Sequence, residues 1–583
     1  MDEPALRHLV REVDAGRLSR RRFMGLMAGL GLPTSMAAAM VPSRRPALAA
    51  TPGQLRIISW QGPTALNPFF SLGLKDLEAC RIFYEPLLDR NADGELVPVL
   101  AAEVPSVETG DVSPDGLSAR IRLKPNVVWH DGRPFTADDV IFNWEYASDR
   151  AAASSVPDFR NVQRMELLDA RTLKVFFRQP TAAWDHPFRT LLIPRHVFGA
   201  YRGNRAREAP ANLKPVGTGP YRCLAFQPGE LLQAERNFKY HLTGQPVFST
   251  LEVKGGGDAV SAARAVLQTG EFDYATNLQV EDDILKRLER QGKGTVRFAF
   301  GGTIEYMICN QTDPSVEVDG ERSSVKTTHP VLTDVTVRRA LSLLIDRAGI
   351  AEQIYGRAAR PAGNFLNGPA MYDSRGVSWE FNPEKAAALL ESHGWARGAD
   401  GVRARGGRPL RLVLQTSANA PREKTAAIMK RAAERAGIAL EIKSVPASVF
   451  FGSDPGNADT AAHFHADLQM YAAFRSTPDP TQLMESFVSW EVASKANRWQ
   501  GANEARWRSD TYDRLFRRAE VELDPIKRAA IYIQMNDLLI QDAVVIPIVR
   551  RARVAASSRR LRRVELGPWG PELGNLGSWR YST

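Results

Sequence analysis

SPDGLSARIRLKPNVVWHDGRPFTADDVIFNWEY, residues 113–146, is the most informative stretch of this chain. A Pro-Asp-Gly turn precedes the alternating run SARIRL (118–123), which predicts a strand, and the Lys-Pro-Asn and His-Asp-Gly segments predict further turns. Thr136 is placed to cap a helix over FTADDVIFNWEYA (135–147), with Asp139 completing a capping box. The stretch therefore predicts a strand and a helix joined by tight turns.

Outward from this stretch, strands and helices alternate along the chain. LRIISW (55–60) predicts a strand near the start, and ALEIKSV and AVVIPIVRR predict strands later. Helices are predicted by apolar spacing and end signals over 332–355, 382–395, 422–438 and 509–542, the last broken at Asp524-Pro525. In the second of these, Asn382 caps the helix and Gly394 ends it. The mixture predicts an α/β protein in several lobes.

The composition is that of a globular protein. The 583 residues are 44% hydrophobic and 24% charged, which excludes disordered and fibrous classes and allows two or three domains. The first 49 residues hold eight arginines and four acids, so about +6 of the formal charge of +10 belongs to the rest. The densest basic cluster, Arg559 to Arg563, is typical of a solvated surface segment, and no nucleic-acid partner is expected.

The first 49 residues have the pattern of an export signal. A basic region precedes an uncharged stretch of apolar and small residues (24–40), and ALA at 47–49 predicts cleavage after Ala49. Ser19-Arg20-Arg21-Arg22-Phe23 resembles the twin-arginine signal, which directs folded cargo to a dedicated export machinery. The alternative is an ordinary signal for unfolded export with additional arginines.

Beyond this signal the chain has no run of about 18 apolar residues, so the mature protein is expected to be soluble. No cysteine lies near the cleavage site, and lipid attachment there is not expected. Cys80, Cys223 and Cys309 are too widely spaced for a zinc motif, and their odd number leaves at least one thiol unpaired. We expect three buried, inert thiols, although one disulfide is possible.

Six segments, in one order, resemble a known family. They read NPFF, YEPLLDRNADGELVPVLA, the opening stretch 113–146, PVGTGPYRCLAFQPGELLQAERNFKYH, HPVLTDVTVRRALSLLIDR and YDRLFRRAEVELDPIKRAAIYIQMNDLLIQDAVVIPIV. Together they resemble the extracytoplasmic solute-binding proteins of peptide-type ABC transporters, the large dipeptide, oligopeptide and nickel binders. The resemblance runs from about residue 55 to 555. Gly217 and Gly219 within it are expected to allow a tight backbone turn.

The resemblance implies a three-lobed periplasmic-binding-protein (Venus-flytrap) fold of the large cluster C type, with mixed sheets and flanking helices. The first lobe is expected from residues 50–90, 196–303 and 546–583, the second from 91–195 and the third from 304–545. The solute is expected between the first and third lobes, which close over it by hinge motion. The implied protein is a periplasmic monomer, not an enzyme, that needs no cofactor and serves the permease and ATPase subunits of an importer.

The loop YAAFRSTPDPTQL (471–483) is expected to contact the solute. Its two prolines exclude a regular helix or a central strand. In peptide-binding relatives the matching loop carries an aspartate that pairs with the ammonium terminus of the peptide, and alignment on the shared Pro-Asp-Pro places Ser476 there. Burying an ammonium group opposite a hydroxyl would lose a charge-assisted pair. Arg475 instead offers a fork suited to carboxylate or phosphate.

This loop predicts a solute that is neutral or anionic, rather than a simple peptide read by its free N-terminus. Opine-like conjugates, phosphorylated or acidic sugars and modified peptides all fit. The alternative is that Arg475 points into solvent and that another acid, such as Asp467 or Glu485, anchors a conventional di- or oligopeptide.

Further candidates for ligand contact follow from the resemblance, and most are rigid aromatic side chains. With Tyr471, Phe474, Arg475 and Ser476 of the loop, they are Trp60, Tyr306, Trp490, Trp499, Asn503 and Trp507. Core packing explains such aromatics equally well. If residues 463–467 form a strand, His463 and His465 share one face with Asp467, which is a weak metal-binding pattern, and two loop or cleft-edge histidines are the favoured interpretation.

Two other classes of function stay open. Twin-arginine cargo is often a redox enzyme, but the sequence lacks HExxH, GxSxG, CxxC and strand-linked GxGxxG motifs, so an exported enzyme is less favoured. A chaperone-like binder would use an aromatic cleft to bind denatured proteins broadly.

Overall fold

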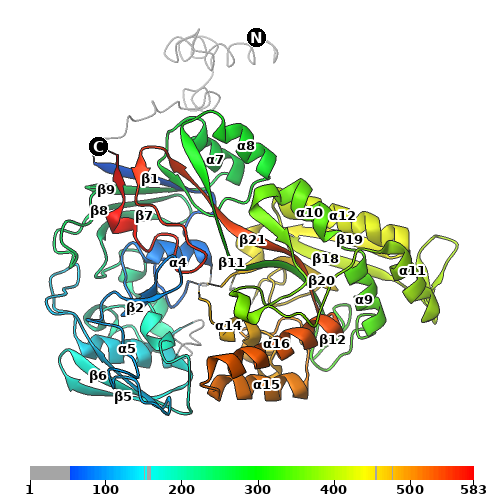
Figure 1. Ribbon diagram of the computed structural model, residues 1–583, viewed down its shortest axis with the longest axis horizontal. Coiled ribbons are helices and arrows are strands. Elements are labelled where there is room, and N and C mark those ends of the chain that lie inside the picture. The colour runs from blue at the N-terminus through cyan, green and yellow to red at the C-terminus, as the bar shows by residue number, and fades with distance from the viewer. Residues whose placement is uncertain are drawn as a thin grey trace, which may run out of the picture. The chain divides into compact units, whose positions relative to one another are not determined.

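The computed structural model describes residues 53–71, 73–149, 152–153, 159–452, 456–475 and 477–582 (Figure 1). The expected signal sequence and Ser476 lie outside the described residues. From Gly53 onward the chain forms one compact unit. Mixed sheets and helices alternate in it, which confirms the α/β class.

Within the described chain an eleven-stranded mixed sheet has the order β19-β18-β20-β11-β21-β10-β1-β9-β8-β7, with β14 beside β21. The pairs β18–β19, β18–β20, β1–β9 and β1–β10 are parallel and the others are antiparallel. The strands are β1 (Gln54–Ser59), β7 (Tyr221–Gln227), β8 (Leu231–Arg236), β9 (Thr250–Gly255), β10 (Tyr274–Ala275), β11 (Gly294–Cys309), β14 (Ala359–Pro361), β18 (Arg411–Ser417), β19 (Ala439–Val445), β20 (Leu468–Ala473) and β21 (Val545–Ser558).

Smaller sheets and the longer helices complete the fold. The small sheets include β2 (Leu88–Arg90) with β3 (Leu96–Pro98), β4 (Ser118–Arg122) with β6 (Thr172–Phe177) and β5 (Val162–Asp169), and β22 (Leu561–Arg562) with β23 (Arg580–Tyr581). The helices include α4 (Leu74–Cys80), α5 (Ala137–Ser148), α7 (Ala259–Leu267), α8 (Asp282–Glu289), α9 (Val335–Leu343), α10 (Arg347–Ile350), α11 (Pro383–Ser392), α12 (Ala420–Ala436), α14 (Thr481–Glu485), α15 (Asp510–Val521) and α16 (Pro525–Asp542).

Two long strands, β11 and β21, run through the middle of the large sheet. They pair from Gly294 opposite Ser558 to Ile308 opposite Val545, and Figure 1 shows them passing from the region of α7 and α8 toward α9. The register shifts between Phe300 and Ile304, where residues 301–303, Gly-Gly-Thr, interrupt the ladder. An irregularity that contains two glycines leaves backbone angles free to change with little steric cost.

The elements expected within residues 113–146 are confirmed. The strand is β4 and the helix is α5, and both hydrogen bonds of the Thr136–Asp139 capping box are present. Gly116 and Gly132 take φ values of +68° and +92°, as the two Asp-Gly turns require. Local sequence signals were therefore sufficient here.

One expected helix is divided. The segment 332–355 forms α9, α10 and a π-helical turn over residues 351–355 instead of a single helix. Asp346 causes the division, because its side chain accepts the N–H of Gly349 at 2.9 Å and starts a new helix after Leu344. By contrast, Asn382 caps α11 as predicted.

Buried apolar side chains form clusters that we group into three cores. Core I lies mainly around β1, β7–β10 and residues 552–579, core II is formed by residues 87–192, and core III by residues 304–549. In core III, alternate residues of β11 face opposite sides of the sheet. Cores II and III lie close to the expected second and third lobes, whose boundaries stay a prediction.

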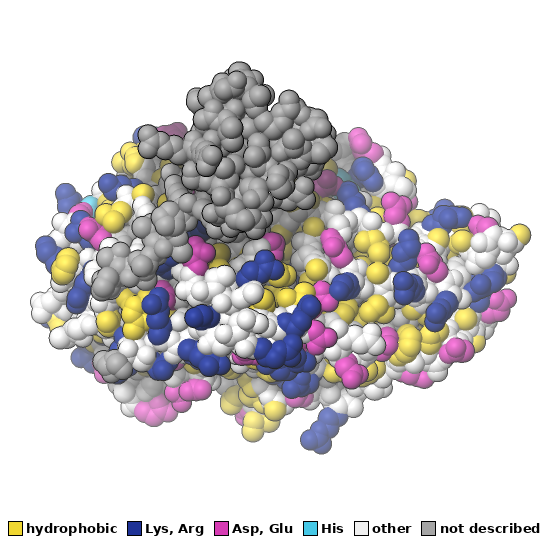
Figure 2. Space-filling view, turned by 90° about the horizontal axis from the view of Figure 1, so that it is seen from above, with side chains coloured by type: hydrophobic (Ala, Val, Ile, Leu, Met, Phe, Trp, Pro, Cys, Tyr) yellow, Lys and Arg dark blue, Asp and Glu magenta, His cyan; other side chains and the backbone are white. Residues whose placement is uncertain are grey.

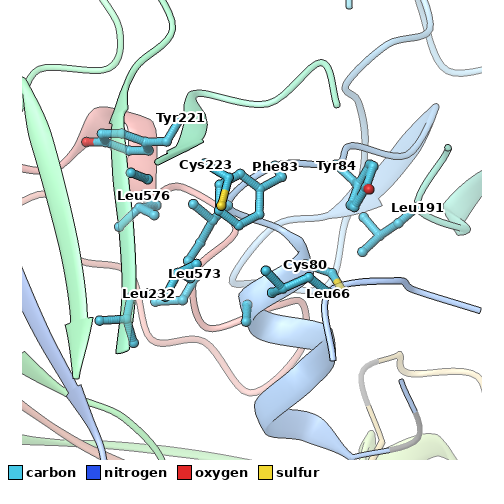
Figure 3. Packing of buried hydrophobic residues seen from close by; sticks show 14 of the residues in the cluster. Leu66, Cys80, Phe83, Tyr84, Leu191, Tyr221, Cys223, Leu232, Leu573 and Leu576 are labelled. Atoms are coloured by element: carbon cyan, nitrogen blue, oxygen red, sulfur yellow. The ribbon is translucent and has the colours of Figure 1, made fainter. Parts of the chain in front are cut away.

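The three thiols lie inside these cores. Figure 3 shows Cys80 and Cys223 among leucine and aromatic side chains of core I. All three cysteines are buried and free. Burial raises the pKa of Cys80 and Cys309 to about 12 and that of Cys223 to about 11, which keeps the thiols protonated and unreactive.

Gly217 and Gly219 permit a close approach of two backbone segments. A Cβ atom on Gly219 would lie 2.7 Å from the main-chain oxygen of Phe83, and one on Gly217 would lie closer still. Gly217 and Gly219 thus have an architectural role in the structure.

Among the described helices, none combines the length and the hydrophobicity that spanning a bilayer requires. Figure 2 shows one face on which basic and acidic side chains are interspersed.

Candidate ligand-binding site

The predicted loop begins where β20 ends. β20 pairs with β11 over its whole length, from Leu468 to Ala473. On the other side it pairs with β18 only as far as Met470. Among the described residues, therefore, no strand pairs with residues 471–473 along the edge of β20 that faces away from β11. Such an edge can present main-chain donors and acceptors to an extended ligand.

Arg475, two residues after β20, is buried inside the protein. Its guanidinium donates hydrogen bonds to the main-chain oxygens of Asn367 (3.0 Å), Gly368 and Pro478 (3.4 Å). Only 4% of the residue is exposed, and this burial lowers its pKa to about 10. The alternative that Arg475 points into solvent is therefore wrong.

Arg475 also touches core I and the irregular part of β11. Its Cζ lies 5.1 Å from the centre of the Trp569 ring, and a Cβ atom on Gly302 would lie 2.5 Å from its Nε. Nε is buried and has no hydrogen-bond partner among the described residues. Gly94, in the β2–β3 turn, packs against Trp569 as well. One guanidinium thus lies where segments from all three cores meet.

Phe474 packs against a second buried arginine. The Cζ of Arg553, on β21, lies 5.2 Å from the centre of the Phe474 ring. Nη1 of Arg553 donates to the main-chain oxygens of Gly567 (3.4 Å) and Gly570 (2.7 Å). Arg475 and Arg553 therefore contact the same C-terminal segment, residues 567–570, whose Trp569 faces Arg475.

Two carboxylates of core I lie near Arg553. Nη2 of Arg553 is 3.7 Å from Glu78 and 3.9 Å from Glu572, distances too long for hydrogen bonds. Glu78 accepts the main-chain N–H groups of Glu572 (2.8 Å) and Leu573 (2.9 Å). Burial raises the pKa of Glu572 to about 7, against the attraction of Arg553, which favours the protonated carboxyl.

Trp60 lies in core I beside a small cavity. Its indole Nε1 donates to the main-chain oxygen of Asn277 (2.9 Å). The cavity, of about 30 Å³, is lined by Trp60, Gln61, Glu78 and Glu572 among others. That volume holds a water molecule or one small polar group.

Tyr306 and Tyr471 lie side by side on β11 and β20. They are cross-strand partners, and their ring centres are 4.9 Å apart. The Tyr471 hydroxyl donates to Glu504 at 2.5 Å, and burial raises the pKa of this carboxyl. Tyr306 is buried in core III, where its ring also contacts Phe365. Both tyrosines thus belong to one aromatic layer.

The four other candidates lie within residues 304–549, but only Trp507 is part of the buried cluster of core III. Trp507 is buried, and its indole donates to Asp542 (2.7 Å), while the amide of Asn503 donates to the main-chain oxygens of Val488 (3.1 Å) and Trp507 (2.8 Å). Trp490 is 42% exposed. Trp499 packs on His463 at 4.0 Å between ring centres. Asn503 and Trp507 thus hold the local loop together.

Residues 463–467 are not a strand, so the condition under which His463, His465 and Asp467 would share one face is not met. β20 begins only at Leu468, and Phe464 between the histidines takes a φ of +48°, so the alternation of a strand is lost. The histidine rings are 5.4 Å apart, but Asp467 accepts instead from His329 Nε2 at 2.9 Å. No group of three potential metal ligands occurs in the part of the chain that the structure describes.

The two alternative acidic anchors are engaged by other groups. Asp467 also accepts the main-chain N–H of Val413 at 2.6 Å. Glu485 forms an ion pair with Arg160 of core II. Burial raises the pKa of Glu485 to about 7, although Arg160 opposes the shift. Neither carboxylate is available in this arrangement without losing a partner.

Sequence reasoning missed four residues at this junction. They are Glu78, Arg553, Trp569 and Glu572, which are far from the loop in the chain. No local pattern marks them, since each looks like an ordinary charged or aromatic residue near a strand or turn. Only the pairing of β11 with β21 and the return of the C-terminal segment bring them to Phe474 and Arg475.

Comparison with known proteins identifies the family. The model of the bacterial extracellular solute-binding proteins, family 5, matches residues 95–495. The glutathione-binding protein GsiB of Pectobacterium atrosepticum is 26% identical over 58% of this chain and 60% of its own length, so that match spans less than two thirds of the relative.

Solved structures agree in fold. The oligopeptide-binding protein AppA of Bacillus subtilis, in complex with a nonapeptide, has a TM-score of 0.77 at 20% identity and covers 91% of this chain and 99% of its own. NikZ of Campylobacter jejuni, in complex with Ni(L-His), has a TM-score of 0.75 at 21% identity over 90% and 99% of the two chains. The three-lobed fold expected from the sequence is thus confirmed. The chain belongs to family 5 of the bacterial extracellular solute-binding proteins.

Proposed function

We propose that this protein is the extracytoplasmic receptor of an ABC importer, which binds a peptide-sized solute between its first and third lobes and delivers it to the permease. The observation that carries the proposal is the position of the 471–483 loop. Phe474 and Arg475, which follow a core III strand, pack on Arg553 and Trp569 of core I. A solute at the end of β20 would therefore touch both lobes.

Hinge motion is assigned to β11 and β21. These two strands connect core I to core III, and their ladder is interrupted at Gly301-Gly302-Thr303. Few backbone angles have to change there for the lobes to separate. The contact of Arg475 with Gly302 places the loop directly beside this irregularity.

The proposed solute is neutral or anionic. Two buried guanidinium groups, Arg475 and Arg553, flank Phe474, and each has one nitrogen without a hydrogen-bond acceptor in the described structure. Glu78 and Glu572 lie 3.7 Å and 3.9 Å from Nη2 of Arg553, but no carboxylate oxygen of the described residues lies within 4.0 Å of a guanidinium nitrogen of Arg475. An acidic group of a solute would supply acceptors for donor-only side chains. The glutathione-binding relative takes a ligand of this acidic, modified-peptide class.

A second candidate is a conventional di- or oligopeptide with a relocated acidic anchor. The cavity beside Trp60 favours it, because Glu78 and Glu572 both line this cavity. An ammonium group there would meet two carboxylates. AppA, which has the same fold, binds a nonapeptide.

Calorimetry on the protein without residues 1–49 separates the two candidates. We expect N-acetylated dipeptides and glutathione to bind at least as tightly as the free dipeptides, and Arg475→Gln to weaken the acidic solutes. Arg408→Gln, which changes an exposed arginine of a peripheral hairpin, is the matched control. Micromolar binding of simple dipeptides that is abolished by blocking the amine would refute an anionic solute.

Two further measurements test the class of function. Native mass spectrometry of protein purified from its own host would reveal the mass of a co-purified solute and a monomer. Recovery of every bound solute unchanged is expected of a receptor, and chemical turnover would instead support an exported enzyme. Broad binding of denatured proteins would support the chaperone-like class.

Export through the twin-arginine route is part of the proposal. Ser19-Arg20-Arg21-Arg22-Phe23 carries it. Changing Arg20 and Arg21 to lysine should leave the full-length precursor in the cytoplasm, and unchanged export of this variant would favour an ordinary signal.

A further inference from the structure

A group of basic side chains lies at one end of the β11–β21 pair, away from Gly301 and Gly302. At that end Gly294 pairs with Ser558. All six members are exposed, and we call them the basic end: Arg290, Lys293, Arg559, Arg562, Arg563 and Arg580. Four come from the C-terminal residues and two from the segment after α8.

Backbone contacts hold the members together. The N–H of Arg559 donates to the main-chain oxygen of Lys293 at 3.1 Å. Arg562 and Arg580 are cross-strand partners in β22–β23, and Nη1 of Arg562 also donates to the main-chain oxygen of Arg559. Arg563 follows directly. The charges are therefore fixed relative to one another by paired backbone, although the guanidinium groups reach into solvent.

The basic end has few counter-charges. Among the described residues, no carboxylate oxygen lies within 4.0 Å of a charged nitrogen of its six members. The neighbouring Asp273 is buried and already paired with Arg560 at 2.8 Å. Glu565 is the exposed acid next to it in the chain.

Several exposed arginines elsewhere on the surface are neutralised in pairs. Examples more than half exposed are Arg195 with Asp138 (3.4 Å), Arg205 with Glu208 (3.2 Å) and Arg411 with Asp400 (2.9 Å). The chain after residue 49 carries a surplus of about +6. The six charges of the basic end lie together and have no ion-pair partner in the described chain, so they form a local excess of positive charge.

We propose that the basic end docks this protein on an anionic phospholipid surface. A cluster of four to eight Lys and Arg side chains is the size that such surfaces attract. A nucleic acid fits less well, because Tyr581, the aromatic residue beside Arg580, is covered by Arg560 at 4.3 Å and offers no open ring for stacking bases. The location outside the cytoplasm, on which this inference rests, also favours a membrane over nucleic acid.

Docking through this end leaves the proposed ligand site free. The basic end and the 301–303 irregularity lie at different places along the same strand pair, with residues 294–300 between them. Core III could therefore still move against core I. Confinement to the membrane surface would bring the receptor to the permease by diffusion in two dimensions.

Vesicle flotation with the protein lacking residues 1–49 tests this proposal. We expect the protein to float with vesicles of 70% phosphatidylcholine and 30% phosphatidylglycerol at low salt and, more weakly, at 150 mM salt, to be released at 1 M salt, and not to bind pure phosphatidylcholine. Each neutralised charge should weaken partitioning by roughly five-fold. Arg559→Gln, Arg562→Gln, Arg563→Gln and Arg580→Gln together should therefore weaken it by more than about a hundred-fold.

The matched control removes the same charge elsewhere. Arg122→Gln, Arg195→Gln, Arg205→Gln and Arg411→Gln change four exposed arginines that are paired with acids, and this variant should still float. Thermal melts confirm that both variants fold. Equal loss in the two variants, binding to neutral vesicles, or no binding by the parent protein would overturn the proposal. Binding to duplex DNA without binding to vesicles would overturn it in favour of another polyanion. Solute binding is measured separately, so failure here leaves the proposed receptor function standing.

Discussion

Replacing Glu305 by glutamine tests the ion network beside the proposed hinge. Glu305 lies on β11, is fully buried, and accepts from Arg422 Nε (2.5 Å) and Arg551 Nη1 (2.8 Å). Glutamine has nearly the same shape but no charge, so two buried guanidinium groups would lose their counter-ion. Breaking a buried ion pair by removing one partner costs about 3–5 kcal/mol.

The magnitude can be converted to a melting temperature. An unfolding entropy of about 2.1 cal/mol/K per residue gives about 1.1 kcal/mol/K for the unit from Gly53 onward, so the variant should melt roughly 3–5 °C lower. Glu208→Gln is the control, because its ion pair with Arg205 is more than half exposed and should contribute less than about 1 kcal/mol. Equal shifts in the two variants would refute the argument.

The same variant has a predictable pH dependence. Burial alone would raise the pKa of Glu305, but Arg422 and Arg551 lower it below its ordinary value. A lowered pKa means that the stabilisation is present above the ordinary pKa near 4.5 and is lost as pH falls through the folded value. The melting difference between wild type and Glu305→Gln should therefore narrow only in acid. A constant difference from pH 8 to pH 3 would contradict this cause.

Three further outcomes are expected. The pKa of Glu485 is raised to about 7, so its ionisation destabilises the folded protein as pH rises from about 4.5 to 7. In urea titrations, the stability of Glu485→Gln relative to wild type should therefore increase between pH 5 and pH 8. A stability difference that does not change with pH would contradict this. The three buried thiols should resist a thiol reagent at pH 8 until denaturant is added, and a thiol titrating in the native protein would show that its burial is incomplete. Gly302→Ala should displace the Arg475 side chain and lower the free energy of unfolding by about 2–3 kcal/mol. In an Arg475→Ala background the same substitution should cost much less. Equal costs in both backgrounds would show that the two residues are not coupled.

The sequence predicted those features that depend on neighbouring residues. Thr136 and Asn382 cap helices as expected, and the helical pair is broken at Asp524-Pro525 as expected, because such end signals act over only two or three residues of the chain. The division of the 332–355 helix shows the limit of this reasoning, since Asp346 interrupts a continuous apolar pattern. Order and class of the elements were predictable, while their ends depended on single polar side chains.

The candidate site was less predictable because its contacts join distant segments. Nothing near Asp467 in the sequence indicates that His329 would donate to it, more than a hundred residues away. Trp507 and Asn503 are ligand-contact candidates from sequence, and in the structure both are buried, with hydrogen bonds to Asp542 and to main-chain oxygens; their contact with a solute stays a prediction. Aromatic and amide residues are ambiguous in this way, because packing and ligand binding use the same chemistry.

The proposed solute contact and the contact with the proposed hinge involve the same side chain, that of Arg475. Its donors hold the main-chain oxygens of Asn367 and Gly368, its ring partner Trp569 belongs to core I, and its Nε lies against Gly302. A solute carboxylate would have to compete with these neutral acceptors, and a charged acceptor does so with about twice the strength. Solute binding and the packing of Gly302 would then change together, because one side chain cannot satisfy both arrangements. We therefore expect the affinity of an acidic solute to depend on the residue at position 302, even though Gly302 need not touch the solute.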